Sequence, residues 1–199
     1  DQVDKSMIAA AKLAMDLALS TEQDGPYSIL DPRRCEHWLR RLFEKAISGF
    51  YRYHLKPSDW KVNTGKPIYW AKNKATIDIE NIFPSMRTDI VLDNVSANQR
   101  IVIDTKFTSV FEKGWHRAKS LKTGYIYQLY SYLRSQEGQG DLLDNNSAGI
   151  LLHPAIDESV DESVFIQGHQ MRFSTVDLTK SHQEIKESLL SLVMTTQFE

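Results

Sequence analysis

Cysteine is nearly absent from this sequence. Cys35 is the only cysteine in 199 residues, so no disulfide can form within the chain and no cysteine-based zinc site is available. The sequence also contains no stretch that resembles a signal peptide and no apolar run long enough to span a membrane. We therefore expect a cytoplasmic protein with no membrane partner.

The sequence also has no excess of basic over acidic residues. Twenty-four Lys and Arg residues face 26 Asp and Glu residues, for a net charge of -2. Such a balance does not indicate a nucleic-acid binder, although local charge can differ greatly from the total. No phosphate-binding loop of the G-x-x-x-x-G-K-[ST] type occurs, so any GTPase that works with this chain must be another chain.

The length and the apolar content predict one main domain with a short appendage. Apolar residues make up 41% of the chain, which is enough to bury a substantial core. Residues 5–20 have the apolar spacing of a helix, and residues 21–30 contain Gly25-Pro26, typical of a linker. We expect residues 1–30 to be an N-terminal helix and linker, left from a partner-binding region or an appendage, and residues 31–199 to be the main domain.

Helical and strand patterns follow one another along residues 31–199. Asp31-Pro32 predicts the start of a long helix, with Asp as the N-cap and Pro at the first position. Its apolar stripe includes Trp38, Phe43 and Phe50. Further helices are expected at 125–133 and after Ser181, and strands at 68–71, 86–93, 100–107, 148–153, 164–167 and 171–176. This order predicts an α/β sandwich with a mixed central sheet flanked by helices.

The two strands expected at 86–93 and 100–107 bring charged residues together. Successive side chains of a strand point to opposite faces, so Asp104 and Lys106 share a face and Thr105 points away. The polar segment 94–99 allows the first strand to fold back on the second, which brings Asp89 beside Asp104. Asp and Lys two positions apart on a strand are commonly just solvated, but here they follow the apolar run 101–103, where unneeded charge is costly.

Two converging carboxylates make a hard oxygen site that suits Mg²⁺, with Mn²⁺ as a substitute ion. Asp89 and Asp104 would hold the metal, and the carbonyl of Thr105 would add a ligand. Lys106 would orient a water nucleophile or offset charge on a phosphoryl group. The pattern therefore predicts hydrolysis of phosphodiesters by in-line attack of a water.

A helix over 125–133 would place Gln128 and Tyr132 four residues apart on one face. Taken alone, this segment is more typical of an aromatic-rich core helix. Together with the acids and the lysine, it predicts that Gln128 and Tyr132 are site residues that steady the site and the substrate. Between the strand and this helix lies a run that contains no acid and that we expect to contact DNA. Its members are Lys113, Trp115, Arg117, Lys119 and Lys122; a merely solvated loop is the alternative.

These motifs resemble the metal-dependent nucleases of the PD-(D/E)xK class, and a Q-x-x-x-Y pair recurs in RecB-like members of that class. More closely, the sequence from about Cys35 to the C-terminus resembles the McrC family. The similarity is carried by the segments 42–47, 86–90, 101–107, 127–133 and 149–154. In many nucleases of the class a glutamate on the early helix assists the metal site, and Glu44 occupies the matching place; a solvated glutamate is the alternative.

The resemblance to McrC implies the endonuclease subunit of a 5-methylcytosine-dependent restriction system. McrC-like proteins act on DNA with a GTP-hydrolysing AAA+ partner, McrB, which recognises the modified base. This chain is shorter and resembles the nuclease half of such a protein. Two other functions stay open from the sequence: a non-catalytic DNA-binding or assembly module with the same fold, and a standalone exonuclease of DNA repair or of a phage.

Overall fold

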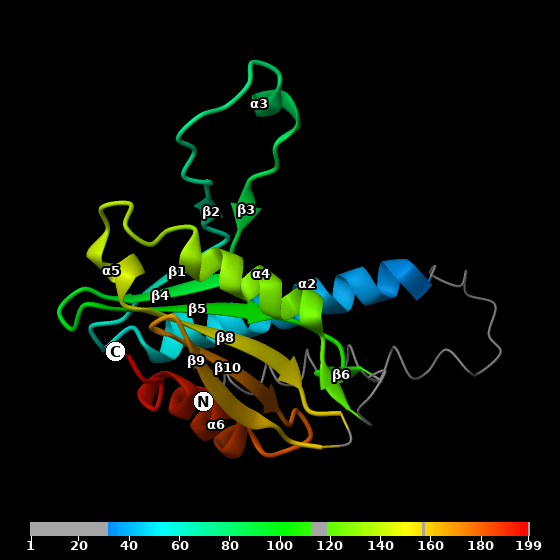
Figure 1. The fold of residues 1–199 in the computed structure, drawn as a ribbon. Coiled ribbons are helices and arrows are strands. Elements are labelled where there is room, and N and C mark those ends of the chain that lie inside the picture. Colours follow the sequence, from blue (N-terminus) through cyan, green and yellow to red (C-terminus); the bar gives the residue numbers. More distant parts are fainter. Residues whose placement is uncertain (1–31, 113–118, 157, 199) are drawn as a thin grey trace.

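A computed structural model describes residues 32–112, 119–156 and 158–198 of the chain (Figure 1). They form an α/β structure with one six-stranded mixed sheet and helices on both of its faces. The predicted fold class is confirmed at this level. The helix and linker expected in residues 1–30, and the N-cap expected at Asp31, lie outside the described residues.

The main sheet has the strand order β1-β4-β5-β8-β10-β9. Its strands are β1 (Lys61–Thr64), β4 (Ile90–Asn94), β5 (Gln99–Thr105), β8 (Ser147–Pro154), β10 (His169–Val176) and β9 (Asp161–Ile166). The central pairs β5–β8 and β8–β10 are parallel, while β1–β4, β4–β5 and β10–β9 are antiparallel. Two small antiparallel pairs lie apart from this sheet: β2 (Pro67–Ile68) with β3 (Met86–Arg87), and β6 (Phe111–Glu112) with β7 (Ser120–Leu121).

Side-chain alternation divides the core between the two faces of the sheet. Ile101 and Ile103 of β5 belong to a cluster with α2 (Pro32–His54) and α6 (His182–Met194). Val102, between them, belongs to a second cluster with α4 (Thr123–Arg134). The helices therefore form an outer layer on each face (Figure 1). Two short helices, α3 (Ile79–Ile82) and α5 (Leu142–Asn145), complete the described part, in which no helix is long and apolar enough to cross a membrane.

Helix α4 packs very closely on β8, and a glycine makes this possible. A Cβ placed on Gly149 of β8 would lie 2.8 Å from Leu129 Cγ of α4. Real side chains do not approach so closely, so the helix rests directly on the backbone of the strand. The position of Gln128 and Tyr132, which α4 carries, is thus set by contact with the sheet.

Three strand and core predictions need correction. The strand expected at 86–93 is broken at Thr88 and Asp89, so that Met86 and Arg87 pair with β2 in a hairpin that projects from the sheet (Figure 1). The strand expected at 68–71 keeps only Ile68, and the first strand of the main sheet is β1 instead. Trp38 is 51% exposed, because the core of α2 begins only at Phe43.

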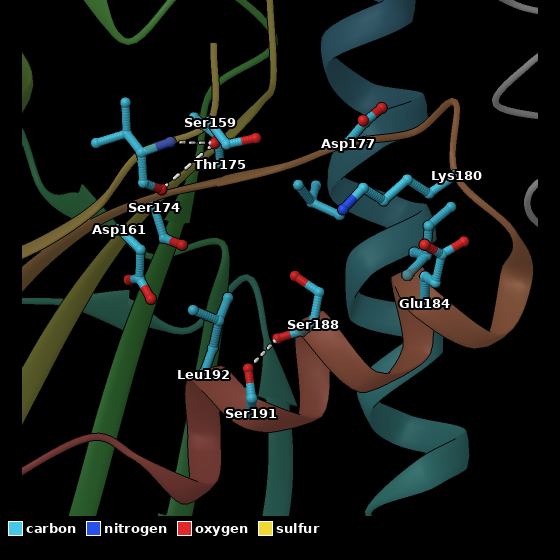
Figure 2. Close-up of a pocket in the computed structure, with 13 residues that line it drawn as sticks. Ser159, Asp161, Ser174, Thr175, Asp177, Lys180, Glu184, Ser188, Ser191 and Leu192 are labelled. Atoms are coloured by element: carbon cyan, nitrogen blue, oxygen red, sulfur yellow. Dashed lines mark hydrogen bonds between the residues drawn. The ribbon is translucent and has the colours of Figure 1, made fainter.

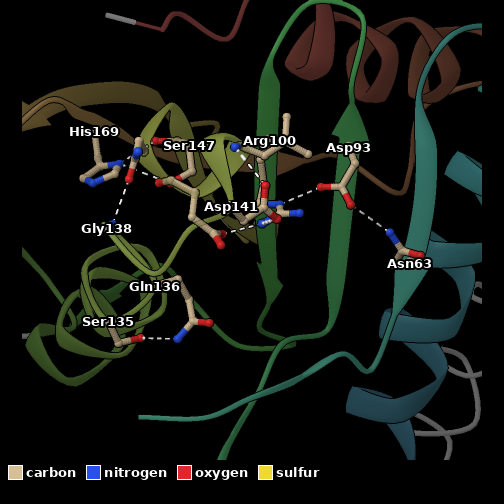
Figure 3. Close-up of polar contacts among 12 residues, drawn as sticks. Asn63, Asp93, Arg100, Ser135, Gln136, Gly138, Asp141, Ser147 and His169 are labelled. Atoms are coloured by element: carbon tan, nitrogen blue, oxygen red, sulfur yellow. Dashed lines mark hydrogen bonds and ion pairs between the residues drawn. The ribbon is translucent and has the colours of Figure 1, made fainter. Parts of the chain in front are cut away.

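A buried ionic network closes the end of β5 that lies away from Asp104. The guanidinium of Arg100 is 5% exposed and lies 2.6 Å from Asp93 Oδ1 and 3.0 Å from Asp141 Oδ2. Asp144 of α5 is its third acidic partner. Figure 3 shows Arg100 between Asp93 and Asp141, with Asn63 of β1 donating to Asp93. The network ties α5 and β1 to the central hairpin.

Candidate active site

The strand register brings the two predicted acids together. Ile90 of β4 pairs with Ile103 of β5, and Asp89 and Asp104 are the residues that come next beyond this pair, where the ladder ends. They lie where β5 ends, on the face covered by α4, because Asp104 follows Val102 by two residues. The predicted proximity of Asp89 to Asp104 is confirmed in this geometry.

Asp104 is almost completely buried, with 1% of the residue exposed. Its Oδ2 lies 2.7 Å from the ammonium nitrogen of Lys106. Within the described residues this buried oxygen accepts no well-directed hydrogen bond, and its charged partner is the ammonium of Lys106. Burial raises the pKa of Asp104 to about 6 against the opposing charge of Lys106, and the charge of Asp89 raises it further. A buried carboxylate that lacks a directed donor is a ready ligand for a cation.

Asp89 is held at the end of β5 by Thr105. Its Oδ2 accepts hydrogen bonds from the backbone nitrogen of Thr105 at 2.7 Å and from the Thr105 hydroxyl at 2.8 Å. The side chain of Thr105 was expected to point away from the acids, but its hydroxyl reaches Asp89. No described residue donates a hydrogen bond to the other oxygen of Asp89. One carboxylate oxygen is thus fixed while the other stays available to a ligand.

A chain of hydrogen bonds joins Lys106 to helix α4. Lys106 Nζ donates to Gln128 Oε1 at 2.9 Å, and Gln128 Nε2 donates to the hydroxyl of Tyr132 at 2.6 Å. The Tyr132 hydroxyl donates in turn to the carbonyl of Arg87 at 2.9 Å, two residues before Asp89. The predicted pair of Gln128 and Tyr132 therefore lies beside the acids and fixes the lysine between Asp104 and α4.

Glu44 of α2 approaches the same place from the other layer. The side chain is half-buried. Burial and then the charge of Asp89 raise the pKa of Glu44, and Glu44 in turn raises the pKa of Asp104. Glu44 is therefore close enough to interact electrostatically with both Asp89 and Asp104. The side chain is only partly solvated, and its auxiliary role at the site stays a prediction.

The donor set fits a small divalent cation. No three His, Cys, Asp or Glu side chains are arranged as a metal site within residues 32–112, 119–156 and 158–198. Mg²⁺ does not need such a cluster, because it binds through one or two carboxylates and keeps several waters. Asp89 and Asp104 supply those two carboxylates, each with an oxygen that lacks a donor. Thr105 and Glu44 stay predicted auxiliary ligands.

One neighbour of the site was missed from the sequence. The ammonium of Lys106 lies 4.9 Å from the ring centre of Tyr125, and that of Lys122 lies 5.6 Å from it. An aromatic face attracts cations electrostatically, so Tyr125 helps to hold two lysines on one side of the acids. The only signal in the sequence was the spacing of Tyr125 and Gln128 on one helix, which cannot identify a cation partner.

The basic segment expected to contact DNA is described only in part. Lys113, Trp115 and Arg117 lie outside the described residues. Lys119 forms an ion pair with Glu158, and Lys122 donates to the hydroxyl of Thr108 at 2.8 Å. The DNA contact of this segment stays a prediction.

A pocket of about 280 Å³ lies elsewhere, between β10, β9 and α6 (Figure 2). Its acids serve local structure: Asp177 accepts hydrogen bonds from Thr179, and Glu184 forms the capping box of α6 with Ser181. Asp161, also in its wall, is paired with Arg172. The pocket contains none of the predicted site residues, so the acids and the lysine form a separate site at the sheet end.

Comparison with known proteins gives two matches. A family model described as "McrBC 5-methylcytosine restriction system component" matches residues 38–144. The type IV methyl-directed restriction enzyme EcoKMcrBC of Escherichia coli (strain K12) is 25% identical over 189 residues. That match covers 94% of this chain and 52% of the E. coli protein, so the chain spans about half the length of this curated relative. The residues matched by the family model include Asp89, Asp104, Lys106, Gln128 and Tyr132.

Proposed function

Because this chain belongs to the family of McrBC 5-methylcytosine restriction system components, we propose that it is the DNA-cleaving domain of such a system. The proposed activity is that of a Mg²⁺-dependent endonuclease of the PD-(D/E)xK class. The observation that carries the proposal is the convergence of Asp89, Asp104 and Lys106 at one end of β5. Two acids and one lysine around a single point match the needs of phosphodiester hydrolysis.

Asp89 and Asp104 would hold the metal, with Thr105 and Glu44 as auxiliary ligands. When bound there, Mg²⁺ would supply positive charge to the phosphoryl group and lower the pKa of a water. The two acids suit this work because Asp104 is buried and Asp89 is half-buried, so water is partly excluded around them. Burial of Asp104 strengthens its interaction with a cation that would share the carboxylate with Lys106.

Lys106 would act on the nucleophile or on the charge that develops on the phosphate. Its ammonium group has three N–H bonds, and its contacts with Asp104 and Gln128 leave at least one of them free. The free N–H would donate to the attacking water or to a phosphoryl oxygen. Gln128 and Tyr132 are positioning residues in this scheme, since they touch Lys106 and the backbone before Asp89 rather than the substrate.

We infer the substrate and the partner from the E. coli relative and from the sequence. The E. coli relative is named a methyl-directed restriction enzyme, and we extend this to the chain as a preference of its complete system for methylated DNA. We propose that a GTP-hydrolysing AAA+ partner of the McrB type, which the resemblance to the McrC family implies, recognises the modified base and controls cleavage. The basic segment that ends at Lys122 would contribute to DNA binding.

The decisive experiment incubates the chain with methylated and unmethylated DNA in Mg²⁺ or Mn²⁺, with and without such a GTPase. We expect metal-dependent cleavage that Asp104→Ala abolishes and that Lys106→Ala lowers by about 10²- to 10³-fold. Asp59→Ala and Lys180→Ala change exposed residues outside the site and should cleave normally. Cleavage that survives both site substitutions would refute the active site. Methyl-independent binding without cleavage under every condition would favour the assembly module instead.

A further inference from the structure

Arg87 brings an additional positive charge into the segment that carries Asp89. It is the last residue of β3, is exposed, and precedes Asp89 by two positions. Within the described parts of the chain no carboxylate forms a salt bridge with it. Surface arginines without a carboxylate partner are common. The functional argument for Arg87 therefore depends on where its guanidinium lies against the backbone.

The guanidinium of Arg87 lies against Gly65. A Cβ on Gly65 would stand 2.7 Å from Arg87 Nη2 and 3.0 Å from Arg87 Nε. Gly65 has a φ of +61° and donates its backbone N–H to the carbonyl of Asp89 at 2.9 Å. The guanidinium therefore occupies space left by a missing side chain, on a backbone segment that is bonded to Asp89.

The main chain of Arg87 is also tied to the site. Its carbonyl accepts the hydrogen bond of Tyr132, and its Cα partner in the β2–β3 pair is Pro67. Lys106, Gln128, Tyr132 and Arg87 are thus consecutive members of one hydrogen-bonded chain. This chain ends at the backbone carbonyl of Arg87, so it fixes the main chain from which the guanidinium extends.

The guanidinium of Arg87 can bind an anion. The charge of Arg87 acts on the half-buried Glu44, whose pKa it lowers against the larger effects of burial and Asp89. This places the guanidinium near the carboxylate of Glu44, with which it forms no salt bridge within the described residues. A planar fork of N–H groups in that situation matches the oxygens of a phosphodiester, which it can bind with two parallel hydrogen bonds.

We propose that Arg87 binds a backbone phosphate of the DNA next to the phosphate that is cleaved, and that glycine at position 65 leaves room for the guanidinium. The inference rests on the proposed function, because it assigns a DNA contact to the same site. It adds a phosphate-binding position two residues before Asp89.

The test measures the binding of a labelled DNA duplex by fluorescence anisotropy, using the full chain in EDTA so that no cleavage occurs. The salt concentration is varied between about 50 and 200 mM. For Arg87→Gln we expect binding about tenfold weaker at low salt and a slope of log K against log salt that is smaller by about 0.9. Arg87→Lys should keep the slope but bind more weakly than the parent, because lysine lacks the planar fork.

Two further variants sharpen the result. Gly65→Ala should weaken binding in the same direction as Arg87→Gln, since its Cβ displaces the guanidinium. Lys61→Gln removes the same charge from an exposed position at the far end of β1, opposite Asp93, and should leave the slope unchanged. Circular dichroism confirms that each variant is folded, and if Gly65→Ala is not, the comparison of the two Arg87 variants decides alone.

Unchanged affinity and slope in Arg87→Gln would overturn the inference, and so would a parent chain that binds no DNA. The proposed nuclease activity fails differently, through cleavage that persists in Asp104→Ala. Because one result is a binding constant in EDTA and the other a cleavage rate in Mg²⁺, the two failures are distinguishable.

Discussion

Lys106 Nζ lies 2.9 Å from Gln128 Oε1, and this hydrogen bond joins the end of β5 to the middle of α4. The lysine is held on its other side by Asp104 at 2.7 Å. A long, flexible side chain loses much of its rotamer freedom when it is fixed at two points. The cost is met during folding, so the ammonium group is already placed when a substrate binds.

The first prediction concerns the hydroxyl of Tyr132, which links Gln128 to the carbonyl of Arg87. Tyr132→Phe removes this link, so Gln128 and therefore Lys106 are less well held. We expect cleavage at saturating DNA to fall by about tenfold, the effect of one hydrogen bond of about 1.4 kcal/mol. Tyr127→Phe is the matched control, because Tyr127 lies on the same helix and is 66% exposed. Equal single-turnover rates for the two variants would contradict the role of Tyr132.

The second prediction concerns the pH dependence of stability. Folding raises the pKa of Asp104 from its ordinary 3.8 to about 6, chiefly through burial. The folded protein therefore binds this proton more tightly than the unfolded chain. The stabilising effect of the protonated acid is complete below pH 3.8 and is lost as the pH rises through about 6, so ionised Asp104 destabilises the metal-free protein at neutral pH.

Asp104→Asn mimics the protonated acid and should remove this penalty. In EDTA at pH 7.5 we expect it to raise the free energy of unfolding by on the order of 3 kcal/mol. Urea unfolding near pH 4 should show almost no difference from the parent. As a contrast, Asp93→Asn should destabilise the protein, because Asp93 is paired with the buried Arg100. A lower stability of Asp104→Asn at pH 7.5 would show that its pairing with Lys106 outweighs burial.

The third prediction tests the close approach of α4 to the sheet. Gly149→Ala would place a Cβ 2.8 Å from Leu129 Cγ and about as close to both of its methyl groups. We expect a loss of stability of about 1–3 kcal/mol, the usual cost of overpacking a core. Gly124→Ala is the matched control on α4, since its added Cβ meets nothing within 4 Å; it should be neutral or stabilise by up to about 1 kcal/mol. Thermal unfolding of both variants distinguishes the two cases, and equal melting temperatures would show that α4 moves away without cost.

Much of the candidate site could be predicted from the sequence because its residues belong to regular elements. Strand alternation continued one residue past β5 predicts that Asp104 and Lys106 lie together, as their ion pair shows. The helical spacing of Gln128 and Tyr132 places both on one side of α4. The turn between β4 and β5 fixes the register that sets Asp89 opposite Asp104. All three signals are local, and local periodicity is what a single sequence records best.

What was missed depends on contacts between segments distant in the sequence. The strand β1 is short and polar, and only its pairing with β4 makes it a strand. The segment around Thr88 has the pattern of a continuous strand, yet the backbone there bonds to Lys66 and Gly65, which begins the projecting hairpin. The contact between Gly65 and the guanidinium of Arg87 has no local signal either, because 22 residues separate the two.

The last prediction concerns the buried guanidinium at the other end of β5. Arg100→Gln leaves Asp93 in the core with only Asn63 as a hydrogen-bond donor. Breaking a buried ion pair by removing one partner typically costs 3–5 kcal/mol, so we expect a loss of about that size in urea unfolding. The same change in Arg134, which is 34% exposed and paired with Glu137, should cost less than about 1 kcal/mol. Because the Arg100 network lies at the far end of the strand from Asp104, the folded fraction of Arg100→Gln should cleave DNA at the parental rate. A reduced rate in fully folded Arg100→Gln would show that β5 transmits strain along its length to Asp104. The Arg100 network and the candidate site would then be structurally coupled.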